Sequence, residues 1–165
     1  MIKKLDTING RILDEISILP AIAHWRLKSK RIVFTNGCFD ILHLGHVDYL
    51  SKAADCGDIL IVGVNSDASV KKLQKGSTRP INNEQARATL VAALHFVDAV
   101  IIFNDDTPYN LIKLIQPDVL VKGADYTVDK VAGSDIVLAN GGEVKLIPLV
   151  EGYSTTAIEK KLREG

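Results

Sequence analysis

The fold is decided by Thr35-Asn36-Gly37-Cys38-Phe39-Asp40-Ile41-Leu42-His43-Leu44-Gly45-His46, which follows the apolar run 31–34 and precedes a helical pattern. This order predicts a strand, a glycine-containing turn and the start of a helix. The unpaired N–H groups and the dipole of a helix start favour an anion, so we expect a phosphate site here. His43 and His46 share one face of the first turn and could donate to the same phosphate oxygens.

Other residues of this stretch suggest how the site is shaped. Gly37 is expected to adopt a positive φ or to let a phosphate approach, and Gly45 is expected to leave room for something close to its backbone. Asp40 is expected to orient the turn, although its carboxylate could also fix an imidazole or act indirectly on a metal ion. Cys38 is expected to be a small buried residue beside the site. A metal site formed by Cys38, His43, His46 and Cys56 is disfavoured because the spacing of these residues matches no zinc pattern.

The composition is that of an ordinary globular domain. Of 165 residues, 47% are hydrophobic and 24% are charged, and 20 basic side chains balance 20 acidic ones. The zero net charge gives no indication of nucleic-acid binding, and no apolar run reaches membrane-spanning length. We interpret the N-terminus as mature sequence because it lacks the apolar core of a signal peptide, and two distant cysteines form no disulfide framework. A cytoplasmic location is therefore expected.

Strand and helix patterns alternate along most of the chain. Residues 5–27 have helical spacing interrupted by Gly10 and Pro20, which predicts two short helices. Short apolar runs predict strands at 32–35, 59–64, 99–103, 119–121 and 144–147. Helical patterns occur at 44–54, 83–94, 108–115, 132–139 and 154–163. We predict an α/β fold with a five-stranded, mostly parallel sheet and helices on both faces, formed by residues 31–165, with an N-terminal helical segment, 1–30, packed on it.

Polar clusters follow every predicted strand, where parallel sheets bind their ligands. These clusters are residues 37–46, 65–67, 104–107, 122–126 and 151–156. Because the carboxyl ends of parallel strands meet at one edge, the clusters are expected to surround one site. Ser154 could cap the last helix, bind a second phosphate at that helix start, or do both.

Segment 71–80 is cationic and rich in loop-forming residues. It is either a solvated surface loop or a mobile flap whose charges stabilise a pyrophosphate leaving group. In the second interpretation Lys71, Lys72 or Lys75 carries the essential charge, and Arg79 is a further cation. The register of these lysines stays open.

The chain resembles a known superfamily of enzymes. The His-x-Gly-His of residues 43–46, preceded by the Gly-x-Phe-Asp of 37–40, is similar to the signature of cytidylyltransferase-like nucleotidylyltransferases. Further motifs occur in the expected order at 64–71, 79–82, 121–126, 131–134, 140–144 and 151–156. From about residue 30 onward they resemble the heptose 1-phosphate adenylyltransferases, which make ADP-heptose for bacterial lipopolysaccharide. Ala124, where relatives often have glycine, and an extra Gln74 are departures.

This resemblance implies a Rossmann-like fold and a reaction in which ATP, with Mg²⁺, and D-glycero-β-D-manno-heptose 1-phosphate give ADP-heptose and pyrophosphate. It implies catalytic roles for His43, His46, Lys71 and Lys75. The implied nucleotide- and phosphate-binding residues are Thr35, Asn36, Gly37, Cys38, Phe39, Asp40, Gly45, Asn65, Asp67, Arg79, Lys122, Gly123, Asp125, Tyr126, Gly152, Tyr153, Ser154, Thr155 and Thr156. A separate sugar kinase would make the substrate, and residues 1–30 either pack on the domain or form a homodimer interface.

Three alternatives remain open. Within the enzyme class, the chain could be a cytidylyltransferase acting on glycerol 3-phosphate or a phospho-alcohol. From other classes, it could be a nucleotide-binding module without turnover, or a structural interaction domain with a vestigial site. Pyrophosphate release in the presence of a sugar phosphate separates the enzyme from the binding module. An ATP-dependent thermal shift separates the binding module from the structural domain.

Overall fold

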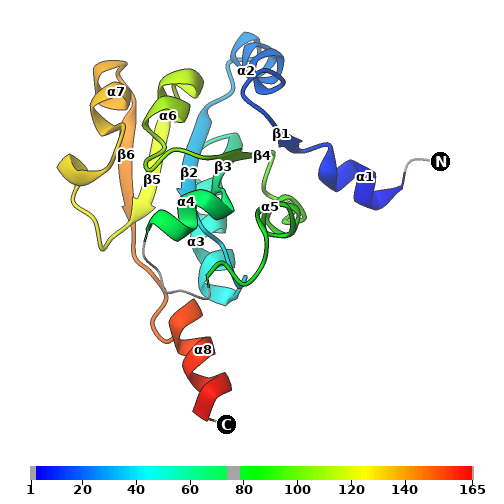
Figure 1. Cartoon of the computed structure of the whole chain (residues 1–165). Helices are drawn as coiled ribbons and strands as arrows, with labels where there is room; N and C mark the ends of the chain where they lie inside the picture. Colours follow the sequence, from blue (N-terminus) through cyan, green and yellow to red (C-terminus); the bar gives the residue numbers. More distant parts are fainter. Residues whose placement is uncertain (1–2, 74–78, 165) are drawn as a thin grey trace.

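The computed structural model describes residues 3–73 and 79–164, which are built around one parallel sheet (Figure 1). Its strands are β1 (Ile12–Leu13), β2 (Ile32–Gly37), β3 (Ile59–Asn65), β4 (Ala99–Phe103), β5 (Val119–Gly123) and β6 (Glu143–Ile147). They lie in the order β1-β4-β3-β2-β5-β6, and every pairing is parallel. The predicted parallel α/β fold is therefore confirmed, but the sheet of the described residues has six strands.

The sixth strand, β1, comes from the segment for which only helices were predicted. It lies between α1 (Lys4–Asn9) and α2 (Ile18–Leu27), and it pairs with β4 at the edge of the sheet. Two residues are too few to show the alternation by which a strand is recognised in a sequence. The prediction of five strands was wrong for this reason, whereas the two short helices are present.

Helices cover both faces of the sheet because successive strand side chains point in opposite directions. In β2, Val33 packs in a cluster with α3 (Leu44–Ala54) and α5 (Glu84–Ala92). Its neighbours Ile32 and Phe34 pack in a second cluster with α2, α6 (Tyr109–Ile115) and α7 (Ser134–Ala139). All three β2 side chains are fully buried, as in a sheet covered on both sides.

The strand order creates a switch point at β2. The chain passes from β2 outward to β3 and β4, and it then returns to form β5 and β6 on the other side of β2. Loops that leave β2 and β5 therefore diverge, which opens a crevice at the carboxyl ends of these strands. The polar clusters predicted from the sequence lie at this edge.

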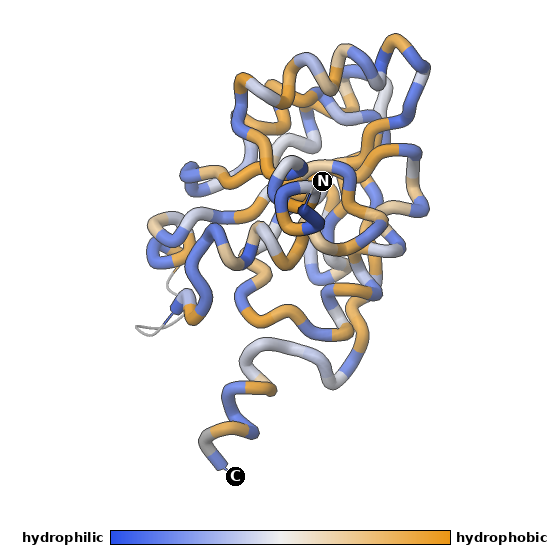
Figure 2. The backbone as a smooth tube through the Cα atoms, turned by 90° about the vertical axis from the view of Figure 1, so that its right-hand side faces the viewer, coloured by the Kyte–Doolittle hydropathy of each residue, from blue (hydrophilic) through white to orange (hydrophobic). Residues whose placement is uncertain are grey.

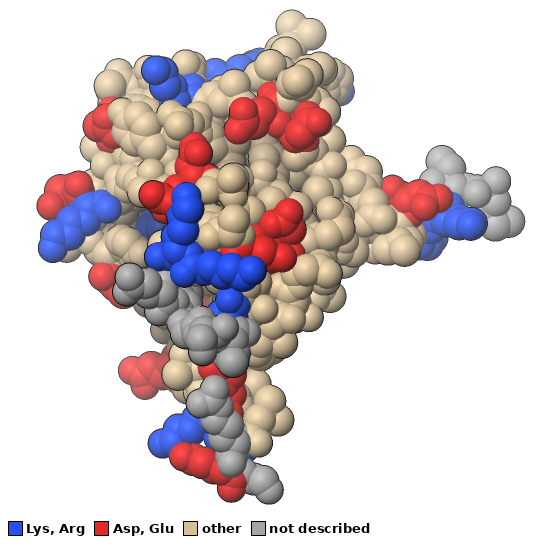
Figure 3. Space-filling view, viewed as in Figure 1, with Lys and Arg blue, Asp and Glu red and all other residues tan. Residues whose placement is uncertain are grey.

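Three further elements complete the described residues: α4 (Asp67–Lys72), a 3-10 turn η1 (Val128–Lys130) and α8 (Thr155–Glu164). Figures 1 and 2 show α8 projecting from the body, with hydrophilic and hydrophobic residues alternating along it. On the face shown in Figure 3, acidic and basic side chains are interspersed. No helix in the described ranges is long and apolar enough to cross a bilayer.

Candidate active site

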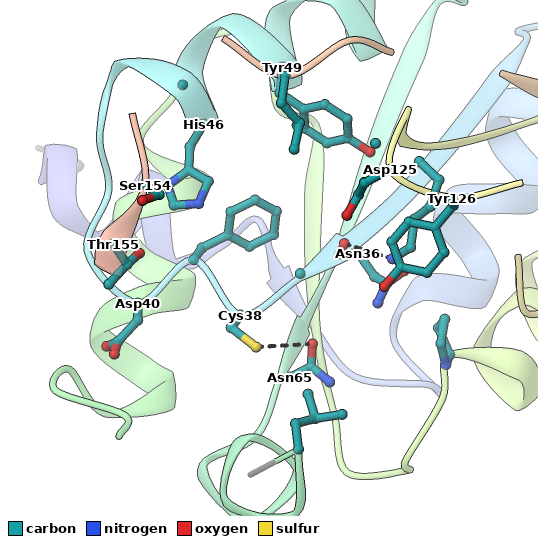
Figure 4. A pocket seen from close by; sticks show the side chains of 18 of the residues that line it. Asn36, Cys38, Asp40, His46, Tyr49, Asn65, Asp125, Tyr126, Ser154 and Thr155 are labelled. Atoms are coloured by element: carbon teal, nitrogen blue, oxygen red, sulfur yellow. Dashed lines mark hydrogen bonds between the residues drawn. The ribbon is translucent and has the colours of Figure 1, made fainter. Parts of the chain in front are cut away.

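A cavity of about 550 Å³ lies at the carboxyl ends of the central strands. Most of the residues predicted for the site line it, and Figure 4 shows several of them converging from separate segments. The predicted residues in its lining are Asn36, Gly37, Cys38, Phe39, Asp40, His43, Gly45, His46, Asn65, Arg79, Lys122, Gly123, Asp125, Tyr126, Tyr153, Ser154 and Thr155. The polar clusters that follow separate strands thus meet in one place.

A pair of stacked histidines stands at the start of α3. The ring centroids of His43 and His46 lie 3.8 Å apart and their planes differ by 17°, an arrangement that the three-residue spacing on a helix produces. Nδ1 of His43 is enclosed and has no hydrogen-bond partner among the described residues, so Nε2 is the atom through which this ring can donate to a ligand. Burial lowers the pKa of His43. An anion beside the ring would favour its charged form again.

The turn after β2 is shaped by Phe39, whose φ of 49° is left-handed. Its ring meets the edge of His46, with centroids 5.3 Å apart and planes at 68°. A Cβ added to Gly37 would lie 2.9 Å from the Phe39 ring. Glycine is needed here because the ring packs against its backbone, and the alternative of a positive φ at Gly37 was wrong.

Asp40 ties this turn to a segment far along the chain. Its carboxylate is almost fully buried and accepts hydrogen bonds from the N–H groups of Ile81, at 3.0 Å, and Asn82, at 2.9 Å. The Asn82 amide in turn donates to the Asp40 carbonyl at 2.7 Å. Asp40 therefore orders backbone, as expected, but the backbone it holds is the segment that follows the basic loop.

The opposite wall of the cavity is polar. The Lys122 ammonium donates to the Asn36 side chain at 2.6 Å and lies 5.5 Å from the centre of the Tyr126 ring. A Cβ added to Gly123 would lie 2.5 Å from Oδ1 of Asp125, so a larger residue there would force the exposed Asp125 carboxylate out of its position beside this strand end. The wall presents amide, ammonium, carboxylate and phenol groups, which can orient a polar ligand.

The basic segment is only partly described. Lys71 and Lys72 belong to α4 instead of a loop; Lys71 is exposed and outside the cavity lining, and Lys72 pairs with Asp106 at 3.1 Å. Lys75 lies outside the described residues. Arg79 lines the cavity and forms an ion pair of 2.8 Å with Glu159 of α8. Both side chains of this pair are largely buried, at 11% and 19% exposure, which limits screening by water.

A second helix start borders the cavity where α8 begins. The Ser154 hydroxyl accepts a hydrogen bond from the N–H of Ala157 at 3.0 Å, so the expected capping role is present. Figure 4 shows Ser154 and Thr155 beside the start of α3. The two helix starts are in contact range, because a Cβ added to Gly45 would lie 3.1 Å from Cβ of Tyr153. The close approach predicted at Gly45 is confirmed.

Four further predicted residues do not line the cavity. Thr35 is fully buried, and its hydroxyl is 2.7 Å from that of Tyr49. Asp67 pairs with a buried arginine at 2.8 Å. Gly152 and Thr156 are exposed; Gly152 serves the backbone with a φ of 80°.

The lining also contains residues that were not predicted as site residues: Tyr49, Leu73, Asp106, Thr107, Pro108, Lys130, Ala132, Leu149 and Val150. Asp106 and Thr107 belong to a polar cluster after a predicted strand, which was the signal that could have identified them. The apolar residues carry no such signal, because a side chain that lines a cavity is of the same type as one in the core. Burial raises the pKa of Tyr49, which keeps its phenol neutral.

A parallel sheet with stacked histidines and two helix starts at its switch point defines a Rossmann-like nucleotide-binding protein. Comparison with known families gives the assignment within that class. The cytidylyltransferase-like family model matches residues 34–161. The chain belongs to this family and is a nucleotidyltransferase.

Curated relatives extend the similarity over nearly the whole chain. It is 56% identical over 153 residues to the bifunctional protein HldE of Wolinella succinogenes, which covers 93% of this chain and 31% of the relative. It is 60% identical over 150 residues to HldE of a Nitratiruptor species, and this match covers 91% of this chain and 31% of that relative. The chain thus spans about a third of the length of these relatives.

Two solved structures share the fold. A lipopolysaccharide core biosynthesis protein from Thermoplasma volcanium superposes with a TM-score of 0.60 and 29% identity, covering 76% of this chain and 99% of that protein. A pantoate-β-alanine ligase from Francisella tularensis gives a TM-score of 0.56 at 16% identity, and the match covers 92% of this chain and 76% of the ligase. The second likeness concerns the fold alone.

Proposed function

We propose that the chain transfers AMP from ATP to D-glycero-β-D-manno-heptose 1-phosphate and releases ADP-heptose and pyrophosphate. The observation that carries this proposal is the single cavity in which the stacked histidines, the start of α8 and the polar wall after β5 converge. The resemblance of the motifs to heptose 1-phosphate adenylyltransferases and the similarity to HldE proteins support the choice of acceptor.

The triphosphate would bind between the two helix starts. His43 and His46 donate to phosphate oxygens there, and the N–H groups and dipoles of α3 and α8 add to the favourable field. Ser154 and Thr155 lie at the edge of the same cavity. Arg79 can exchange Glu159 for a phosphate oxygen because it already lines the cavity.

The chemistry needs positioning and charge stabilisation more than proton transfer. A phosphate oxygen of the acceptor forms a bond to the α-phosphorus, while the bond from that phosphorus to the bridging oxygen breaks and pyrophosphate leaves with the electron pair. The attacking oxygen is already anionic, so no strong general base is required. Histidines and other cations would act by stabilising the charge that develops on the transferred and leaving groups.

Mg²⁺ would enter with the triphosphate. Asp40 is engaged by backbone N–H groups, and Asp106 pairs with Lys72. The described part of the chain contains no group of three or more His, Cys, Asp or Glu side chains able to hold a metal ion. We propose that the cation is held mainly by nucleotide phosphates and water, as is common for Mg²⁺.

The polar wall after β5 would receive the rest of the substrates. Lys122, Asp125 and Tyr126 offer a donor cation, an acceptor and an aromatic face within one loop. Such groups can distinguish nucleobases and sugars because an unmatched polar partner is left unpaired in the closed site. We further propose that a kinase activity outside residues 1–165 supplies the sugar 1-phosphate, and that residues 1–30 take part in a homodimer if one forms.

A pyrophosphate-release screen of nucleotides against sugar phosphates tests the proposal. ATP with the heptose 1-phosphate should release pyrophosphate, and a His43→Ala/His46→Ala double variant gives the background of the same preparation. ATP-dependent thermal stabilisation without pyrophosphate release from any acceptor would instead favour a nucleotide-binding module. Absence of both signals would favour a structural domain.

A further inference from the structure

Arg87, on α5, is a fully buried charged residue that does not line the cavity. A buried guanidinium is tolerated only when its donors are satisfied. Its Nη1 donates to the Cys38 carbonyl at 2.6 Å, and its Nε donates to the Asn82 carbonyl at 3.0 Å. Its Nη2 pairs with Asp67 at 2.8 Å. One side chain therefore satisfies partners in three separate segments.

The three segments surround the candidate active site. Cys38 belongs to the turn after β2, Asp67 begins α4, and Asn82 follows the basic segment. Asp40 binds the N–H of Asn82 while Arg87 binds its carbonyl, so the peptide units on both sides of this residue are fixed. Removal of the guanidinium would remove the hydrogen bonds that it donates to the Cys38 and Asn82 carbonyl groups.

The bond to Cys38 connects Arg87 with the histidine pair. The Cys38 carbonyl belongs to the peptide unit that precedes Phe39, so its orientation fixes one side of the Phe39 φ torsion. That torsion is left-handed, a conformation that a non-glycine residue keeps only when its surroundings hold it. The Phe39 ring in turn packs on the edge of His46. A continuous set of contacts thus leads from Arg87 to a predicted catalytic ring.

We propose that Arg87 is a positioning residue: it holds the turn 37–40 in the conformation that orients His46, and it does not touch the substrate. Its kinetic consequence rests on the proposed function, whereas its effect on the turn does not. A structural role alone would lower stability without changing the orientation of His46.

The test compares Arg87→Met with a matched control, Arg11→Met. Arg11 also donates to three backbone carbonyls, those of Ala92, Leu94 and Val97, at 3.2, 3.4 and 3.1 Å, and it lies outside the cavity lining. Arg87→Met should lower kcat about 100-fold, as expected for a misplaced catalytic group, and change the KM for ATP by less than about threefold. Arg11→Met should lower the melting temperature and leave kcat unchanged.

A ligand-free spectrum gives a second readout. The ring of Phe39 shifts the proton resonances of His46, so Arg87→Met should displace them in the same direction as Phe39→Leu. Wild-type kcat together with wild-type His46 resonances in Arg87→Met would overturn the proposal, as would an equal loss of kcat in Arg11→Met.

If Arg87→Met does not fold, Arg87→Lys, which keeps a cation near Asp67 without the planar fork, is judged by the same two readouts. If the wild-type chain shows no turnover, the proposed function fails and the His46 resonances still decide the role of Arg87.

Discussion

Replacement of Gly45 by alanine should separate activity from stability. The new methyl group would lie 3.1 Å from Cε1 and Nδ1 of His43 and 3.1 Å from Cβ of Tyr153. Ordinary carbon contacts are about 3.5–4.0 Å, so these neighbours must retreat by about half an ångström. Cβ of Tyr153 is bonded to the backbone ahead of α8, so this contact is relieved by a small outward shift of that exposed segment. His43 is stacked on His46 with centroids 3.8 Å apart, so its ring cannot retreat toward its partner.

Gly45→Ala should affect stability and activity in opposite directions. Alanine is a better helix residue than glycine by about 1 kcal/mol, which favours the folded state at this position in α3. A displacement of about 1 Å can lower a rate about 100-fold, so half that displacement of His43 should lower kcat about tenfold. A tenfold loss corresponds to about 1.4 kcal/mol of transition-state stabilisation. We therefore expect a melting temperature equal to or above that of the wild type and a lower kcat.

The assay is pyrophosphate release at saturating ATP, with melting temperatures from calorimetry on the same samples. Gly10→Ala is the control, because Gly10 caps α1 with a right-handed φ of −64° and lies outside the cavity lining. It should leave kcat unchanged. A Gly45→Ala variant with wild-type kcat would refute the reasoning that the packing of His43 against this backbone sets the geometry of the site.

His43→Ala and His46→Ala should each lower kcat about 10²–10³-fold and leave the fold intact, as loss of one preorganised donor does; wild-type kcat in either variant would remove that ring from the mechanism. At least one of Lys71→Ala, Lys72→Ala and Lys75→Ala should lower kcat more than it weakens ATP binding, since leaving-group charge grows in the transition state; three variants with wild-type kcat would make this segment a solvated surface. Burial lowers the pKa of His43 from 6.5, so the unfolded chain takes up this proton at a higher pH than the folded chain does. The stability due to this difference is complete above about pH 6.5 and is lost as the pH falls through the folded pKa. Urea unfolding should therefore show a larger loss of stability between about pH 7 and about pH 5 in the wild type than in His43→Gln, and equal losses would contradict this pKa shift.

The fold was predictable wherever one pattern was long enough to be recognised. The runs in β2 and β3 are continuously apolar, as expected for strands buried on both faces, and their parallel pairing follows from the helices between them. β1 escaped prediction because its two residues owe their conformation to pairing with β4. α4 was missed because it is six residues long and begins inside a segment dominated by loop-forming and cationic residues.

The cavity was predictable for a topological reason. Parallel strands bring the loops at their carboxyl ends to one edge, so polar clusters that are far apart in the sequence had to meet. This placed residues of the turn 37–46 and the loop 122–126 in one lining. Thr35 lies outside this lining because successive residues of a strand alternate between faces, and its buried hydroxyl is 2.7 Å from that of Tyr49.

The supporting contacts were not predictable from the chain alone. Asp40 accepts hydrogen bonds from Ile81 and Asn82, which lie 41 and 42 positions further along the chain. Arg87 donates to Cys38, which lies 49 positions before it. No spacing rule connects residues so distant, and an arginine on an amphipathic helix is usually exposed. Only the packed structure shows that these side chains hold the turn beside the histidines.

The most direct test of the central claim is a comparison of kcat/KM for four pairs: ATP or CTP as nucleotide, with the β-heptose 1-phosphate or glycerol 3-phosphate as acceptor. A pocket built for one base leaves buried partners unpaired with the other, at a cost of about 1–3 kcal/mol each, which is about 5- to 150-fold. The account predicts efficient turnover only for ATP with the heptose 1-phosphate, with glycerol 3-phosphate inert. Efficient turnover of CTP with glycerol 3-phosphate would contradict the heptose assignment and leave the nucleotidyltransferase fold in place.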